Sequence, residues 1–220
     1  MQLPKEAKII SNIIEKHGGL SKEQAAYILI YGCGKSEYAV KAILEGMVIK
    51  KQVSLVADNF YVPYALQSIN REKIILLWVA INEIINNALE RSEAAGKPYD
   101  YSSIMDNLNT LCEGTGAYDM TFLENNSIFD LTYMTSDSLH KATFLDRTAT
   151  KVKPNKGGDN VYVASELFVF ESTDKDAAIL ETLKTSGFEV PYDVYFVNMK
   201  EGLSGMPDLN LQRISAMRHD

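Results

Sequence analysis

The segment from Arg71 to Ala94 constrains the fold most, because it runs without a glycine or proline and carries a wide apolar face. Its apolar residues recur at three- and four-residue steps, which is the spacing of one face of a helix. They are Ile74, Leu77, Trp78, Ile81, Ile84, Ile85 and Ala88. The spacing predicts one long helix over residues 71–94. Because its apolar surface is wider than one small domain covers, we also expect the helix to contribute a dimer contact.

Three shorter helices are predicted before the long one. The apolar stripe within Ala7–Ile14 has helical spacing and is followed by Gly18, a residue that commonly ends helices. Ser21 and Gln24 have the spacing of a capping box, which predicts the start of a second helix. Ser36 is well placed to cap a third helix.

The sequence pattern then changes from helical to strand-like. Residues 47–56 and 59–64 are rich in β-branched and aromatic residues, and they flank a turn-forming Ala-Asp-Asn cluster. These features predict a hairpin. Three helices followed by a hairpin is the order of a winged helix-turn-helix, so we assign residues 1–68 to such a domain.

The letters Gly34-Lys35-Ser36 resemble the end of a phosphate-binding loop, but the rest of that motif is absent. Such a loop needs another glycine five residues before Gly34, and that position is Leu29. It also needs a preceding strand, whereas the preceding residues are predicted to be helical. We therefore interpret the three letters as a turn and a helix cap.

The charge distribution restricts where a nucleic acid could bind. The net charge is −7; residues 1–70 hold eight lysines and six acidic residues, whereas residues 71–220 hold fourteen basic and twenty-three acidic residues. Contact with DNA is therefore expected only in the N-terminal third, and a dimer would double its few phosphate contacts. The alternative is a winged helix that contacts only proteins. The side chains expected to face DNA are Lys35, Ser36, Tyr38 and Lys41 on the third helix, with Lys50 and Lys51 at the hairpin.

Residues 69–220 are predicted to form the long helix and then a mixed α/β domain, so the expected fold class of the whole chain is α+β. Weak helical spacing follows the long helix up to Leu111. Alternating or continuous apolar residues then predict strands, and a helix with one apolar face is expected between the last two of them. An irregular tail with a short helix near its end is expected to complete the domain. The predicted strands cover residues 127–135, 141–150, 161–172 and 192–199, and the helix covers 174–187.

The order of these elements resembles the replication-relaxation proteins of bacterial plasmids and conjugative elements. The resemblance is carried by the winged helix, by "WVAINEII" in the long helix, and by "FDLTYM" and "ATFLDRT" in the strands. It implies that the second domain is similar to a degenerate restriction-endonuclease core. It also implies that Asp130 matches the first acidic position of such a core and Asp146 the second.

The chain departs from a working nuclease at two positions. A metal-dependent nuclease needs clustered carboxylates for Mg²⁺, and usually a lysine two residues after the second acid. Here Phe129 replaces the proline of the motif, and Thr148 stands at the lysine position. We therefore expect Asp130 and Asp146 to have structural roles, and we expect no enzymatic activity.

The remaining residues give no sign of a metal, a cofactor or a membrane. Cys33 and Cys112 are interpreted as free thiols, and His17, His140 and His219 have no partner at metal-ligand spacing. No apolar run is long enough to span a bilayer, and the first residues do not resemble a secretory signal. We expect a cytoplasmic homodimer that binds double-stranded DNA and regulates or assists replication, transfer or transcription on a mobile element. Its acidic second domain is expected to dimerise or to dock a protein partner.

Overall fold

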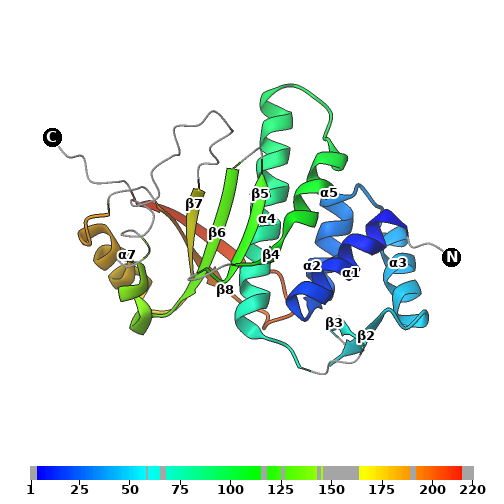
Figure 1. Ribbon diagram of the computed structural model, residues 1–220, viewed down its shortest axis with the longest axis horizontal. Coiled ribbons are helices and arrows are strands. Elements are labelled where there is room, and N and C mark those ends of the chain that lie inside the picture. Colours follow the sequence, from blue (N-terminus) through cyan, green and yellow to red (C-terminus); the bar gives the residue numbers. More distant parts are fainter. Residues whose placement is uncertain are drawn as a thin grey trace, which may run out of the picture. The chain divides into compact units, whose positions relative to one another are not determined.

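A computed structural model describes residues 4–57, 59–64, 68–114, 118–124, 127–142, 145, 164–188 and 192–214 of the chain. The fold mixes helices and sheets, so the expected α+β class is confirmed (Figure 1). The chain divides into two compact units. Unit 1 consists of Met1–Glu113 with Lys200–Met206, and unit 2 of Gly114–Met199 with Pro207–Asp220. The expected boundary after residue 68 lies inside unit 1.

Unit 1 is mainly helical and contains one small sheet. Three short strands form this antiparallel sheet in the order β1-β3-β2. Strand β1, which lies between the first two helices, therefore pairs with the second strand of the hairpin. The elements in chain order are α1 (Lys5–His17), β1 (Leu20–Ser21), α2 (Lys22–Tyr27), the π-helical turn η1 (Ile28–Gly32), α3 (Glu37–Ile49), β2 (Val53–Val56), β3 (Phe60–Pro63), α4 (Arg71–Ala94), α5 (Tyr101–Thr110) and β4 (Cys112–Glu113).

The predicted start and stop signals of α1 and α2 are confirmed. Helix α1 ends at Gly18, whose φ of 82° is the left-handed conformation that glycine adopts without strain. Helix α2 begins with the complete capping box: the Gln24 amide N–H donates to Ser21 Oγ at 3.0 Å, and the Ser21 N–H donates to Gln24 Oε1 at 2.9 Å. Gln24 Nε2 also donates to the Ile74 carbonyl at 2.9 Å, which connects α2 to α4.

Helix α3 and the hairpin differ in length from the expectation. The helix continues past Gly46 to Ile49, so the residues from Met47 to Ile49 are helical and not extended. A Cβ added at Gly46 would have no atom within 4 Å, so packing does not require a glycine at this position. The two strands are correspondingly short, and their pairing closes with Val56 opposite Phe60.

Helix α4 has the bounds predicted from the sequence. Its first turn is capped by Asn70 Oδ1, which accepts from the Lys73 N–H at 3.1 Å. All side chains from Ile74 to Ile81 are buried within the single chain.

Unit 2 is built on five neighbouring strands in the order β5-β6-β7-β8-β9. Strands β6, β7 and β8 are parallel, and β5 and β9 pair antiparallel at the two sides. Helix α7 packs against one face of these strands and contributes Ile179 and Leu183 to an aromatic-rich core. The elements are β5 (Met120–Glu124), β6 (Ser127–Met134), the 3₁₀ turn η2 (Ser136–Ser138), β7 (Ala164–Glu171), α7 (Asp176–Thr185), β8 (Tyr192–Asn198) and β9 (Asp208–Ile214).

Three sequence expectations for unit 2 need correction or comment. Residues 141, 142 and 145 are helical where a strand over 141–150 was predicted, so that prediction is wrong for these residues. Asp146 lies outside the described residues. The tail was expected to be irregular, but residues 208–214 form the strand β9 along β8. Strand β5 was not predicted.

Candidate nucleic-acid interface

The turn before α3 is shaped by its glycines and by α5. Gly34 has a φ of 64°, and a Cβ at this position would lie 2.9 Å from the Tyr101 ring. A Cβ on Gly32 would lie 3.1 Å from Leu108 Cδ1. A larger residue at position 34 would therefore combine backbone strain with a clash. The Gly-Lys-Ser letters form a tight turn packed on α5, in agreement with their interpretation as a turn.

Ser36 begins α3 as predicted. Its Oγ accepts a hydrogen bond from the Ala39 N–H at 3.4 Å, and the side chain is exposed. The cap orients the first turn of α3 and so determines which side chains that turn presents to solvent.

Lys35 has a partner inside unit 1. Its Nζ lies 2.7 Å from Glu6 Oε1, and only 33% of the lysine side chain is exposed. The hydrogen bond from Lys35 lowers the pKa of the Glu6 carboxyl, and the same bond raises the pKa of Lys35. The pair joins the first turn of α1 to the turn before α3. Lys35 thus contributes to the structure around α3, whereas the sequence suggested an outward-facing cation.

The outer edge of α3 carries Tyr38 and Lys41, both exposed as expected. Tyr38 is 85% exposed, which is unusually high for a tyrosine. Lys41 Nζ lies 3.9 Å from Glu45 Oε1 one turn later, and both side chains are largely exposed. An exposed pair at this distance contributes little stability, so Lys41 can exchange its partner for a phosphate.

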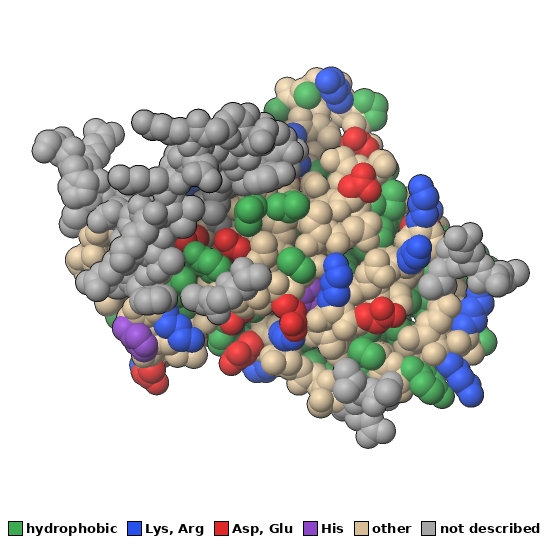
Figure 2. Space-filling view, in the orientation of Figure 1, with side chains coloured by type: hydrophobic (Ala, Val, Ile, Leu, Met, Phe, Trp, Pro, Cys, Tyr) green, Lys and Arg blue, Asp and Glu red, His purple; other side chains and the backbone are tan. Residues whose placement is uncertain are grey.

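Lys50 and Lys51 follow the last turn of α3, directly before the hairpin. Both side chains are exposed. Lys51 has a φ of 56°, which places its backbone in the left-handed region and turns the chain toward β2. Figure 2 shows that basic side chains on the face in view are dispersed among acidic and uncharged ones. The described residues on this face therefore show separate cations and no dense basic patch.

An apolar groove lies beside these lysines. It has a volume of about 490 Å³ and is lined by residues of α2, α3, β2 and β3, including Leu44, Val48 and Leu55. Ile49 borders the groove and is 79% exposed. Apolar surface of this kind is more typical of protein contacts than of phosphate contacts. Sequence reasoning missed it because residues 47–49 were expected to be part of a strand.

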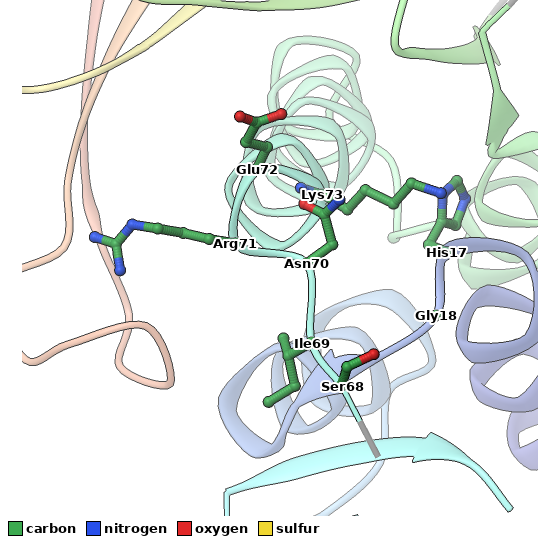
Figure 3. Close-up of a pocket in the computed structure, with 8 residues that line it drawn as sticks. All are labelled: His17, Gly18, Ser68, Ile69, Asn70, Arg71, Glu72 and Lys73. Carbon is green, nitrogen blue, oxygen red and sulfur yellow. Dashed lines mark hydrogen bonds between the residues drawn. The ribbon is translucent and has the colours of Figure 1, made fainter. Parts of the chain in front are cut away.

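A second cavity, of about 600 Å³, lies at the beginning of α4 (Figure 3). His17 lines it and is buried, and burial lowers the pKa of its imidazole to about 4, with the charge of Lys73 acting in the same direction. Figure 3 shows Arg71, Glu72 and Lys73 pointing in different directions from the first turn of α4. Lys73 pairs with Glu113. The charged groups do not converge on one point, so the cavity lacks the geometry of an anion site.

The carboxylates of unit 2 have structural partners. Thr121 Oγ1 donates to Asp130 Oδ1 at 2.6 Å, and burial raises the pKa of Asp130. Glu166 on β7 is in register with Asp130, and its Oε1 accepts from the Tyr118 hydroxyl at 2.8 Å. Sequence reasoning missed Glu166, although it is the one acidic residue within the apolar stretch "SELFVF". Among the described residues, no three His, Cys, Asp or Glu side chains gather where they could hold a metal ion.

The thiol of Cys33 is buried, and burial raises its pKa to about 12. A thiol of this kind stays protonated at neutral pH and is a poor nucleophile. Cys33 is therefore a packing residue of the turn before α3.

Comparison with known proteins finds no matching family model and no matching curated protein. The resemblance to replication-relaxation proteins consequently stays a prediction. Within the described part of the chain, none of the helices has the length and apolar character needed to cross a membrane.

Proposed function

We propose that unit 1 contains a winged-helix module that binds duplex DNA through α3 and the β2–β3 hairpin. The observation that supports this best is the order of elements: α1, β1, α2 with η1, α3 and then a hairpin whose second strand pairs with β1. In proteins of this architecture the third helix enters the major groove and the hairpin approaches the backbone. The outer edge of α3 is exposed, as such contact requires.

The proposed contacts fall into two groups. Tyr38 and Lys41 project from the first half of α3 toward base edges and nearby phosphates, while Lys50 and Lys51 contact phosphates beside the hairpin. Ser36 and Lys35 act indirectly, because the Ser36 cap and the Lys35–Glu6 pair fix the beginning of α3. With so few cations, affinity for non-specific DNA is weak, and two copies on one site would strengthen it.

The proposal predicts that Lys41 on α3 and the two lysines that follow the helix, Lys50 and Lys51, carry a salt-dependent part of the affinity. The slope of log K against log salt is negative for such binding. In the variant Lys41→Ala/Lys50→Ala/Lys51→Asn, each lost phosphate contact makes this slope less steep by about one. Asparagine is chosen at position 51 because it tolerates the φ of 56° found there. Fluorescence anisotropy with a labelled duplex, at several salt concentrations, measures this slope.

The matched control for this experiment is Lys97→Ala, which removes an exposed lysine after α4. The control is expected to bind DNA as the original protein does. If the triple variant and the control have the same affinity and the same salt slope, α3 is not the DNA-binding element.

A second candidate function is a protein-interaction module built on the same fold. The exposure of Tyr38 and Ile49, together with the apolar groove beside α3, favours it. Binding of a protein through apolar contacts depends only weakly on salt, so the salt series also separates the two candidates.

For the whole chain we propose a non-enzymatic role as a regulator or accessory factor of replication, transfer or transcription on a mobile element. In this proposal the cytoplasmic protein recognises DNA with unit 1 and presents unit 2 to a protein partner. The excess of acidic over basic residues after position 70 supports a partner other than nucleic acid for that part. This role would be supported if a protein of replication, transfer or transcription co-purifies with the chain and contacts residues of unit 2.

A further inference from the structure

The outer edge of α3 carries a line of exposed side chains that includes two large apolar residues. Tyr38, Ala42, Glu45 and Ile49 are all exposed, at 85% for Tyr38 and 79% for Ile49. Their spacing of four, three and four residues places them along one side of the helix. Single exposed apolar side chains are ordinary, but two that flank a small residue on one helix edge are typical of a helix–helix contact.

Apolar grooves lie on both sides of this edge. The groove toward the hairpin, described above, contains Leu44 and Leu55. A smaller one of about 200 Å³ lies toward α1 and contains Ala7 and Met47. A ridge with a groove on each side is the surface into which the side chains of a second helix interlock.

The edge is complementary to itself. Tyr38 and Ile49 lie equally far along the chain from the point between Ile43 and Leu44, close to the middle of α3, and so do Ala42 and Glu45. A second α3 packed antiparallel across this midpoint therefore sets Tyr38 of each copy against Ile49 of the other. The same rotation brings Lys41 of each copy beside Glu45 of the other, so opposite charges meet twice. Gly46 adds open space near the centre, with no atom within 4 Å of an added Cβ.

We infer that two copies of this chain pair through antiparallel α3 helices, and that this pairing competes with duplex DNA. The competition rests on the proposed function, because it requires DNA to use the same edge of α3. The pairing itself rests only on the exposed side chains and their symmetry. One helix edge with its two grooves makes a small interface, so the dimer is weak and forms as the protein concentration rises.

Sedimentation equilibrium of the full chain, over a wide concentration range, tests the pairing. The mass is expected to rise from one chain toward two. Glu45→Lys sets lysine against lysine at both charge pairs, and the dissociation constant of the dimer rises about tenfold. The double variant Lys41→Glu/Glu45→Lys restores opposite charges, and dimerisation returns.

The matched control is Glu90→Lys, which makes the same change of charge at an exposed position of α4. Circular dichroism establishes that each variant is folded. The pairing is refuted if the original protein stays a single chain at the highest soluble concentration. It is also refuted if Glu45→Lys dimerises as well as Glu90→Lys, or if the double variant fails to recover.

Duplex DNA titrated into the dimer tests the competition. The dimer is expected to dissociate as protein–DNA complexes form. The variant Ile49→Ser loses an apolar contact of the dimer without a change of charge, so it is expected to bind DNA at a lower protein concentration than the original protein does. If the protein–DNA complexes still contain the dimer that Glu45→Lys weakens, the proposed competition is wrong. If no duplex binds while the charge swap still controls dimerisation, the proposed function fails and the pairing stands.

Discussion

Burial determines the chemistry of single side chains in unit 1. His17 ends α1 and is 3% exposed, and burial keeps the pKa of its imidazole near 4, so it is neutral at physiological pH. A histidine in solution has a pKa near 6.5. The unfolded chain therefore binds a proton at a pH where the folded chain does not, and stability decreases as the pH falls from about 6.5 toward 4.

Replacement of His17 by glutamine is expected to remove this dependence while keeping a polar side chain. The difference in unfolding free energy between the original protein and His17→Gln should change by about 3 kcal/mol between pH 7.5 and pH 4, in the direction that favours the variant at low pH. Urea unfolding at a series of pH values measures the difference. Parallel pH profiles for the two proteins would show that His17 is not buried as a neutral group.

Helix caps determine where α2 and α3 begin, and the two caps differ in burial. Ser21 is fully buried and takes part in a reciprocal pair of hydrogen bonds, whereas Ser36 is exposed and accepts one longer bond. Loss of a buried hydrogen-bonding group costs more than loss of a solvated one, because the remaining donor has no water to replace it.

Ser21→Ala should therefore destabilise the protein by about 1–2 kcal/mol, and Ser36→Ala by about 0.5 kcal/mol. Chemical unfolding of both variants, with the original protein in the same series, provides the measurement. Equal losses for the two serines would contradict the role given to the buried capping box.

The sequence predicted elements where the signal is local. The capping residues, the glycine after α1 and the apolar period of α4 all act within a few residues, and α4 has the predicted bounds. Pairings between distant residues could not be predicted. The bond between Lys35 and Glu6, the neighbouring positions of Asp130 and Glu166, and the pairing of β1 with β3 depend on tertiary contacts. Strand β9 was not predicted, because its residues alternate only weakly and because Gly202, Gly205 and Pro207, which precede it, are typical of irregular segments.

The whole protein is expected to lack nuclease activity. Mg²⁺ needs clustered carboxylate ligands, whereas no three such side chains gather among the described residues, and the Thr121 hydroxyl already donates to one oxygen of Asp130. Incubation with supercoiled DNA and Mg²⁺ or Mn²⁺ should leave the DNA intact. Nicking that disappears in Asp130→Asn would overturn this expectation.

The division into units has a further consequence for experiments on fragments. Lys200–Met206 belongs to unit 1, although it lies between two strands of unit 2. The polypeptide therefore passes from one unit to the other three times, near residues 113, 199 and 206. A single proteolytic cut after residue 113 leaves the β8–β9 connection, which belongs to unit 1, on the C-terminal piece, and a fragment ending at residue 113 lacks these seven residues of its own unit. Internal deletion with a short linker, and not simple truncation, is the way to isolate unit 2.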